Sequence, residues 1–432
     1  MSIDNTEGDF NSTPLRHAWQ QENIDASVMK TLARDDKFFL HQSLSTPCLT
    51  EIIKCEGSYI IDASGRKFLD FHGNSLHQVG YSHPKIIEAI KSQLDELSFC
   101  PRRFTNKPAI ELAEKLGSYA PKGLDKVLFA PGGTSAVGMA MKLARYATGR
   151  HKTISMWGTF HGASLDAISI GGESLFRDDL GPLLPGCFHV PWPKKVEDAD
   201  EIEKIIEDEG DIGAIISEPM RCTTVEKPED GYWIRLRELC DRHGVLLILD
   251  EIPLAFGRTG KMFCCEHSGV IPDILIVGKG LGGGVFPMAA IIAKNNLDIA
   301  QLKALGHYTH EKSPVGSAAA LALFDVIESE NLIQRSACLG QKIKLELEES
   351  LSGLSIVKEI RGLGLALAIE LTSPDISELV LYECLSNGLS FKVSNGNILT
   401  LTPPLTITDQ EMDDAVCIIR SALQKAHSME SV

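Results

Sequence analysis

Between about residues 123 and 294, short apolar runs alternate with longer segments whose apolar positions recur at helical spacing. Within each run, apolar and polar residues do not alternate, which indicates strands buried on both faces of a sheet. Strands separated by helices are typical of a largely parallel sheet covered by helices on both sides. The expected strands are residues 127–130, 153–156, 214–217, 245–249, 274–277 and 288–293, and the expected helices are residues 135–148, 199–208 and 232–243.

Outside this region the pattern changes toward mixed helices and strands. Residues 59–62 read as a strand that is followed by a turn, and a long helix is expected from Pro314 to about Glu328. We therefore expect an α/β protein with a large α/β lobe and a smaller α+β lobe that takes both chain ends. The expected division is residues 66–312 for the large lobe, with residues 1–65 and 313–432 in the smaller one.

Length and charge narrow the range of functions. A chain of 432 residues can bury the core that two lobes require. A formal net charge of -16 argues against nucleic acid or an anionic membrane surface as a partner, although a local positive pocket could still hold a phosphorylated small molecule. The first 16 residues lack a signal-peptide pattern, and no stretch has the apolar length of a membrane span, so a cytoplasmic protein is expected.

An aspartate and a lysine each follow a strongly apolar run. Asp250 ends the run 245–249, and Lys279 follows the run 274–277 after a single glycine. Ligands of open α/β sheets bind at the carboxyl ends of strands. A carboxylate there could hold the nitrogen of a heteroaromatic ring, and a desolvated lysine could form a Schiff base. The alternatives are a turn or N-cap aspartate and a solvated lysine at the edge of the sheet.

Two further segments carry candidate ligands for a phosphorylated ring. Gly132-Gly133-Thr134 joins an expected strand to an expected helix, where free N–H groups and the helix dipole favour a phosphate and Thr134 would add a hydroxyl. Phe160 lies a few residues beyond another strand and could stack on a ring. The alternatives are a glycine turn with a capping threonine and an ordinary core phenylalanine. A P-loop is disfavoured, because Lys279 is followed by glycine and not by serine or threonine.

Taken in order, these signals form a pattern that resembles the class III aminotransferases, which depend on pyridoxal phosphate and have fold type I. The resemblance extends over nearly the whole chain from about Leu49. The matching motifs include Leu69-Asp70-Phe71, Gly80-Tyr81-Ser82-His83-Pro84, Lys142-Leu143-Ala144-Arg145, Phe160-His161-Gly162, Glu218-Pro219, Asp250-Glu251-Ile252, Gly257-Arg258-Thr259-Gly260, Gly278-Lys279-Gly280 and Arg361-Gly362-Leu363-Gly364.

The resemblance implies a fold, a cofactor and an assembly. It implies a large domain with a mostly parallel seven-stranded sheet, a smaller α+β domain, no metal, and a homodimer or larger assembly with shared active sites. In such a site Lys279 would carry the cofactor and move protons. The other implied cofactor contacts are Asp250 on the ring nitrogen, Gly133 and Thr134 on the phosphate, Phe160 and Ile252 on the two ring faces, and Thr309 on the phosphate from the neighbouring subunit.

The sequence also departs from the family pattern. Pro253 replaces a glutamine near the ring hydroxyl, and Arg221 stands where glutamine is common. Many family aminotransferases clamp a substrate carboxylate with an arginine that a glutamate masks, and our alignment places Thr400 and Thr223 at those two positions. A transaminase needs that clamp for its oxo-acid or amino-acid partner. Its joint loss favours a reaction with one substrate.

Some class III relatives are lyases, and among these the chain is most similar to the (R)-1-hydroxy-2-aminoethylphosphonate ammonia-lyases of phosphonate degradation. The resemblance implies release of ammonia from a small aminophosphonate. An aminotransferase with an unusual donor or acceptor, or a phospho-lyase for a phosphorylated amine, is the alternative. Candidates for substrate binding are Arg221, Arg102, Arg103, His72, Asn74 and His77, each of which could instead have a surface or packing role.

Overall fold

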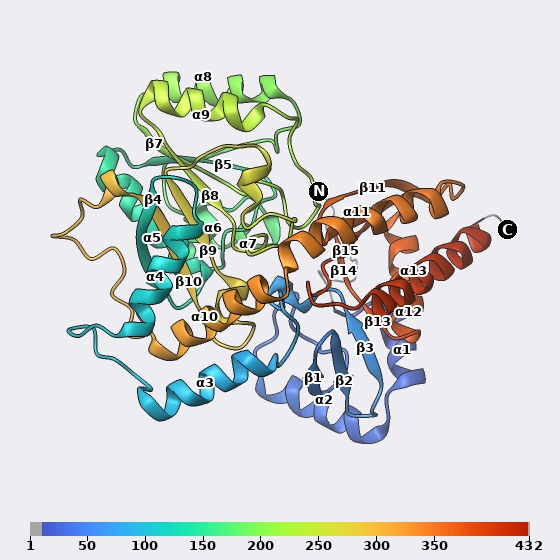
Figure 1. The fold of residues 1–432 in the computed structure, drawn as a ribbon. Helices are drawn as coiled ribbons and strands as arrows, with labels where there is room; N and C mark the ends of the chain where they lie inside the picture. Colours follow the sequence, from blue (N-terminus) through green and yellow to red (C-terminus); the bar gives the residue numbers. More distant parts are fainter. Residues whose placement is uncertain (1–10, 431–432) are drawn as a thin grey trace. The chain divides into compact units, whose positions relative to one another are not determined.

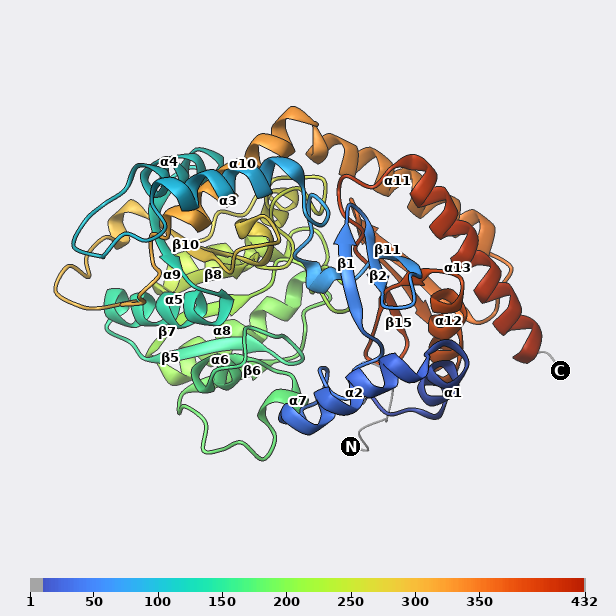
Figure 2. The same ribbon diagram turned by 90° about the horizontal axis from the view of Figure 1, so that it is seen from below.

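The computed structural model describes residues 11–430 of the chain. The chain divides into two units, and Figures 1 and 2 show their helices and strands. The large unit contains residues 84–222 and 226–333. The small unit contains the described chain up to residue 83, residues 223–225, and the chain from residue 334.

The large unit is built on one sheet of seven strands. These strands are β4 (Leu124–Ala130), β5 (Lys152–Met156), β6 (Cys187–Val190), β7 (Ile212–Ser217), β8 (Leu246–Asp250), β9 (Ile274–Val277) and β10 (Ala289–Lys294). Their order is β4-β10-β9-β8-β7-β5-β6. β10 is antiparallel to both of its neighbours, and the other neighbouring strands are parallel. The expected mostly parallel sheet is therefore confirmed.

Each of the six apolar runs in this region forms a strand, and only β6 was not expected. β6 lies at an edge of the sheet, where it pairs with β5 alone. Three of its four residues are only partly buried. Because an edge strand buries less of its surface, its sequence need not form a continuous apolar run. The burial pattern that reveals the central strands is therefore missing here.

Helices cover the sheet of the large unit. They are α3 (Pro84–Glu96), α4 (Lys107–Tyr119), α5 (Gly133–Thr148), α6 (Leu165–Ile170), α7 (Ser174–Arg177), α8 (Ala199–Glu209), α9 (Tyr232–His243) and α10 (Pro314–Ser329). α5 packs across β7, β8, β9 and β10 and is buried around most of its circumference, including Val137, Met139 and Met141. α8 and α9 lie side by side (Figure 1). None of the helices within residues 11–430 has the length and apolar character required to cross a membrane.

The small unit has two four-stranded sheets with helices packed on them. One sheet has the order β1 (Ile52–Glu56), β2 (Tyr59–Asp62), β3 (Lys67–Asp70), β13 (Leu389–Ser390), and the other has the order β11 (Val357–Leu363), β12 (Ala366–Leu371), β15 (Ile398–Leu401), β14 (Lys392–Ser394). Trp19 and Tyr382 bring the two ends of the chain together in one apolar cluster. The helices are α1 (Pro14–Asn23), α2 (Ala26–Phe38), α11 (Leu332–Leu351), α12 (Pro374–Ser386) and α13 (Asp409–Glu430).

The boundaries between the units differ from the expected ones at residues 65 and 312. Residues 66–83 fall in the small unit, because β3 pairs with β2 and β13 of that unit. Residues 313–333 fall in the large unit, because α10 packs on α3 and α4. Residues 223–225 leave the large unit altogether. Strand pairing and helix packing, and not composition, set these limits.

Candidate active site

The carboxyl ends of the parallel strands in the large unit place the candidate residues at one edge of the sheet. Asp250 is the last residue of β8, and Lys279 follows β9 after Gly278. The segment after β4 leads into α5 through Gly132, and the segment after β5 carries Phe160. Because parallel strands end at the same edge, segments far apart in sequence contribute to one site.

Asp250 is held by two hydrogen bonds and keeps capacity for a third. Its side chain is 2% exposed. Oδ2 lies 2.8 Å from Nδ1 of the buried His161, and Oδ1 accepts the Ile252 N–H at 3.0 Å. Each carboxylate oxygen has two lone pairs, so Asp250 can accept a further bond from a protonated ring nitrogen. The contact with His161 fixes the orientation of the carboxylate.

A second buried carboxylate lies close to this pair. Glu218 directly follows β7, and one of its oxygens accepts the Cys222 N–H at 2.9 Å. Burial raises the pKa of Glu218 to about 7, although the nearby His161 opposes that rise. We expected the Glu218-Pro219 motif from the family resemblance but assigned no role to its carboxylate. The sequence alone does not indicate that Glu218 lies within electrostatic range of His161 and Asp250.

The N-terminus of α5 is a glycine turn with free main-chain N–H groups. Gly132 is the N-cap and Gly133 the first helical residue, so the first N–H groups of the helix have no partners within it. At Gly132 a Cβ atom would meet nothing within 4 Å, whereas at Gly133 it would lie 2.9 Å from Ile252 Cδ1. Ile252 therefore packs directly against this turn. Free N–H groups and the helix dipole at this place suit a phosphate.

Lys279 has a strained backbone conformation. It is the first residue of the short helix η4 (Lys279–Gly282), its side chain is exposed, and its φ is 46°. Positive φ is uncommon for a residue with a side chain and is most often retained where a function requires it. At the preceding Gly278, a Cβ atom would lie 3.4 Å from Ile252 Cγ2. Ile252 thus packs between the glycine turn at the start of α5 and the segment that carries Lys279.

Phe160, in the segment after β5, keeps an exposed ring. It is 38% exposed, and its ring lies 4.6 Å from that of Phe176 at an interplanar angle of 47°. The residues of this edge offer what pyridoxal phosphate requires: N–H groups for the phosphate, a carboxylate with free lone pairs for the ring nitrogen, apolar side chains for the ring, and an amine. The spare acceptor capacity of Asp250 and the glycine turn at α5 show that the site fits this cofactor.

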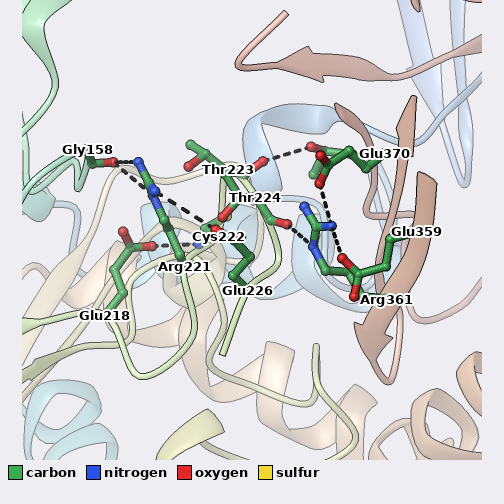
Figure 3. A network of polar contacts seen from close by, with 11 residues as sticks. Gly158, Glu218, Arg221, Cys222, Thr223, Thr224, Glu226, Glu359, Arg361 and Glu370 are labelled. Carbon is green, nitrogen blue, oxygen red and sulfur yellow. Dashed lines mark hydrogen bonds and ion pairs between the residues drawn. The ribbon is translucent and has the colours of Figure 1, made fainter. Parts of the chain in front are cut away.

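Arg221 is anchored by one edge of its guanidinium group (Figure 3). Nε and Nη2 donate to the Gly158 carbonyl at 3.0 and 2.5 Å, and the group lies 5.9 Å from the Trp192 ring. Glu226 Oε2 forms an ion pair with Nη1 at 4.0 Å, a separation beyond hydrogen-bond distance. Gly158 has φ +73°, and a Cβ atom there would lie 1.8 Å from Nη2. The second N–H of Nη2 and the N–H groups of Nη1 are not used by Gly158.

The two threonines at the expected positions of the carboxylate clamp are in contact within the small unit. Thr400 Oγ1 donates to the Thr223 carbonyl at 3.1 Å. Arg361 fixes the same segment through Nε, which donates to the Thr224 carbonyl at 2.8 Å (Figure 3). Arg361 also pairs with Glu370 at 2.8 Å. The sequence alignment proposed the first of these relationships but gave no role to Arg361 in holding residues 223–225.

Among the remaining candidates, His77 is buried in the small unit, with Nε2 2.9 Å from the Asp70 carbonyl oxygen, whereas Arg102 and Arg103 are exposed in the large unit. His72 is half-buried in the small unit, and its main-chain N–H donates to Asp70 Oδ1 at 3.0 Å. Asn74, also in the small unit, is exposed and has φ 47°. Thr309 is exposed in a loop of the large unit, where the Tyr308 N–H donates to Glu311 Oε2. Their predicted roles in binding the substrate or a neighbour's cofactor remain predictions.

Comparison with known proteins identifies relatives over nearly the whole chain. A model of the family described as "Aminotransferase class-III" matches residues 41–423. An (R)-1-hydroxy-2-aminoethylphosphonate ammonia-lyase from Vibrio splendidus is 45% identical, with 97% of this chain and 95% of that protein covered. An acetylornithine aminotransferase from Methanopyrus kandleri is 36% identical, with 90% and 97% covered.

Solved structures agree with this assignment. A transaminase from the marine bacterium Virgibacillus has a TM-score of 0.88 at 28% identity, with 93% of this chain and 99% of that chain covered. An omega transaminase from Pseudomonas jessenii in complex with PMP has a TM-score of 0.87 at 28% identity, with 92% and 98% covered. The expected fold type I architecture is confirmed.

Proposed function

Since the chain belongs to the class III aminotransferase family and uses pyridoxal phosphate, we propose that it is a lyase that releases ammonia from (R)-1-hydroxy-2-aminoethylphosphonate. The observation that carries the proposal is the contact between Thr400 and Thr223, which are neutral at the two positions where many family aminotransferases bind and mask a carboxylate. The relative from Vibrio splendidus, named for this ammonia-lyase activity, supports it.

The proposed reaction rearranges the substrate without a second reactant. A proton leaves the carbon that bears the amine, and the hydroxyl group on the neighbouring carbon leaves as water. The resulting enamine tautomerises and is hydrolysed, so the net products are phosphonoacetaldehyde and ammonia. The water that is lost in the first step is regained in the last, and the cofactor is unchanged.

The chain's own residues divide this work. The bound cofactor supplies an electron sink next to the amine-bearing carbon. Asp250, oriented by His161 at 2.8 Å, would accept a hydrogen bond from the ring nitrogen and favour its protonated form. Lys279 is proposed to bind the cofactor covalently in the resting enzyme and to take the proton from the substrate carbon. Phe160 and Ile252 are proposed to hold the two ring faces.

The phosphonate group requires a cation or several N–H donors, and Arg221 is the proposed one. Its anchored edge fixes the guanidinium through Gly158, so the opposite edge is oriented before an anion arrives. A guanidinium fork of this kind suits a phosphonate, which presents several acceptor oxygens. We propose His72 and Asn74 as further substrate contacts and Gly133 and Thr134 as holders of the cofactor phosphate.

The assembly and location follow the family resemblance. We propose a cytoplasmic homodimer with shared active sites, in which Thr309 of each subunit approaches the cofactor phosphate of the other. The exposure of Thr309 leaves it accessible to a second copy.

The deciding experiment uses one amine substrate and no oxo acid. Holoenzyme is incubated with (R)-1-hydroxy-2-aminoethylphosphonate while ammonia, inorganic phosphate and the cofactor spectrum are followed. Many turnovers of ammonia release with the cofactor spectrum restored support the lyase. A single conversion of the cofactor to its amine form, with turnover only after an oxo acid is added, shows an aminotransferase. In a parallel incubation with a phosphorylated amine in place of the aminophosphonate, release of phosphate in step with ammonia shows a phospho-lyase.

A further inference from the structure

Three polar side chains are linked by hydrogen bonds beside the glycine turn at the start of α5. Thr134 is the second residue of α5, and Ser164 immediately precedes α6. Their hydroxyl oxygens are 2.7 Å apart, and the Ser164 N–H donates to Thr134 Oγ1 at 3.3 Å. The third member is Asp166, whose Oδ1 accepts the Ser164 hydroxyl. Residue types alone did not indicate this chain.

The chemistry of the three groups fixes the direction of every bond. A carboxylate only accepts hydrogen bonds, so Ser164 must give its single hydroxyl proton to Asp166. The bond between the two hydroxyls must then be donated by Thr134. Thr134 therefore has its proton committed to Ser164, and its oxygen accepts the Ser164 N–H. In this arrangement the hydroxyl that the sequence suggested as a phosphate donor is already engaged.

Close packing keeps the chain of bonds in place. A Cβ atom at Gly138 would lie 2.5 Å from Asp166 Oδ2, and a Cβ atom at Gly162 would lie 2.5 Å from Thr134 Oγ1. Glycines on both sides thus allow the polar groups to approach α5 closely. Asp166 also lies in the first turn of α6, where free N–H groups favour a carboxylate.

We propose that Asp166 and Ser164 are positioning residues for the cofactor's phosphate end: they hold the proton of Thr134 on Ser164, so the phosphate is bound by main-chain N–H groups of α5 and not by the Thr134 hydroxyl. The proposal rests on the pyridoxal-phosphate dependence of the family and not on the proposed lyase reaction. It assigns a function to two residues for which the sequence analysis gave none.

The test is a double-mutant comparison of cofactor affinity. The apoenzyme is prepared from wild type, Thr134→Val, Asp166→Asn and the double variant, and the dissociation constant of pyridoxal phosphate is measured by titration. Valine keeps the shape of threonine but has no hydroxyl. Asparagine can donate to Ser164, which frees Ser164 to donate to Thr134 and frees the Thr134 proton for the phosphate.

We expect Thr134→Val to weaken binding less than about threefold in the wild-type background and about tenfold or more in the Asp166→Asn background, the loss of one hydrogen bond to a charged group. The ratio of the two losses decides: about threefold or more supports the proposal, and a smaller ratio overturns it. Ser164→Ala is measured alongside Asp166→Asn and replaces it if that variant does not fold, because the asparagine carbonyl can still accept from Ser164, whereas Ser164→Ala removes the acceptor of the Thr134 proton.

Two controls separate positioning from general damage. Pyridoxal, which has no phosphate, should give a ratio near one, and a ratio as large as that for pyridoxal phosphate would overturn the proposal. Thr148→Val alters a threonine at the other end of α5, where the hydroxyl donates to the Ala144 carbonyl at 2.8 Å. In the Asp166→Asn and wild-type backgrounds alike, Thr148→Val should leave the affinity for pyridoxal phosphate unchanged. A background-dependent effect of Thr148→Val as large as that of Thr134→Val would also overturn the proposal.

Discussion

The hydroxyl of Thr400 donates to the main-chain carbonyl of Thr223 at 3.1 Å, and it also reaches Ser394 Oγ at 3.1 Å. Thr400 is 6% exposed. In our alignment an arginine and a glutamate occupy these two positions in many aminotransferases of the family. Losing only one member of such a pair would leave a buried charge without compensation. A neutral contact between the two positions is the arrangement expected after both charges are lost together.

Thr400→Arg should therefore destabilise the protein by about 2–4 kcal/mol, because it buries a guanidinium without a carboxylate. The double variant Thr400→Arg/Thr223→Glu should recover at least a third of that loss. Chemical unfolding of wild type, both single variants and the double variant measures the coupling between the positions. Additive losses would contradict the inferred relationship between them.

Arg221→Ala should lower kcat/KM for the aminophosphonate by about ten- to a hundredfold, as expected for one or two charge-assisted hydrogen bonds. Gly158→Ala should act in the same direction, because its Cβ atom would lie 1.8 Å from Arg221 Nη2 and displace the guanidinium. Lysine cannot bond Gly158 and also present a fork, so Arg221→Lys should not restore activity.

The matched control for this pair is Arg235→Ala, which removes a surface ion pair with Asp200 at 3.2 Å on the α8–α9 face. It should leave kcat/KM unchanged. Equal losses in Arg221→Ala for the aminophosphonate and for an amine without an anionic group would show that Arg221 does not recognise the phosphonate.

Lys279→Ala should abolish turnover and remove the visible absorption of the lysine-bound cofactor, while pyridoxal phosphate can still bind without the covalent link. Borohydride reduction followed by peptide mapping should label Lys279 in wild type. Lys303→Ala, in an exposed loop of the large unit, is the control and should behave as wild type. Turnover in Lys279→Ala close to that of wild type would show that Lys279 is not the residue that binds the cofactor and moves the proton.

Because of Glu218, the free energy of unfolding is expected to fall as the pH rises. Burial raises its pKa from 4.5 to about 7, so the folded state binds a proton that the unfolded state has already released. The stability this proton provides is complete below pH 4.5 and is lost as the pH rises through about 7.

Glu218→Gln lacks this dependence. Its unfolding free energy relative to wild type should therefore rise by about 1–3 kcal/mol between pH 5 and pH 8. Unfolding curves measured at both pH values with equal cofactor content give the difference. A constant difference between the two proteins would show that the carboxyl is already ionised at pH 5.

Thr309 can be tested by subunit mixing. Thr309→Val should weaken cofactor binding, and Lys279→Ala should be inactive. A mixed dimer of these two variants contains one site with Lys279 from one subunit and Thr309 from the other. That site should regain tight cofactor binding and activity, at up to half of the wild-type level per dimer. No regain in demonstrated heterodimers would show that Thr309 does not serve the neighbouring site.

The sequence predicted the parts of the site that strand ends place. Asp250 directly follows one buried apolar run, and Lys279 follows another after a single glycine. Such runs can be recognised from the sequence alone. The partners of Asp250 and Thr134 could not be read from the sequence, because His161 and Ser164 contact them across 89 and 30 residues of chain. The anchoring of Arg221 on Gly158 was missed for the same reason.

Residues 223–225 have a consequence for protein engineering. The chain leaves the large unit after Cys222, contributes Thr223, Thr224 and Val225 to the small unit, and returns at Glu226. A chimera of two homologues with crossovers only near residues 83 and 333 would therefore combine these three residues from one parent with Thr400 and Arg361 from the other. In recombination libraries, residues 223–225 and the C-terminal segment should therefore always be taken from the same parent.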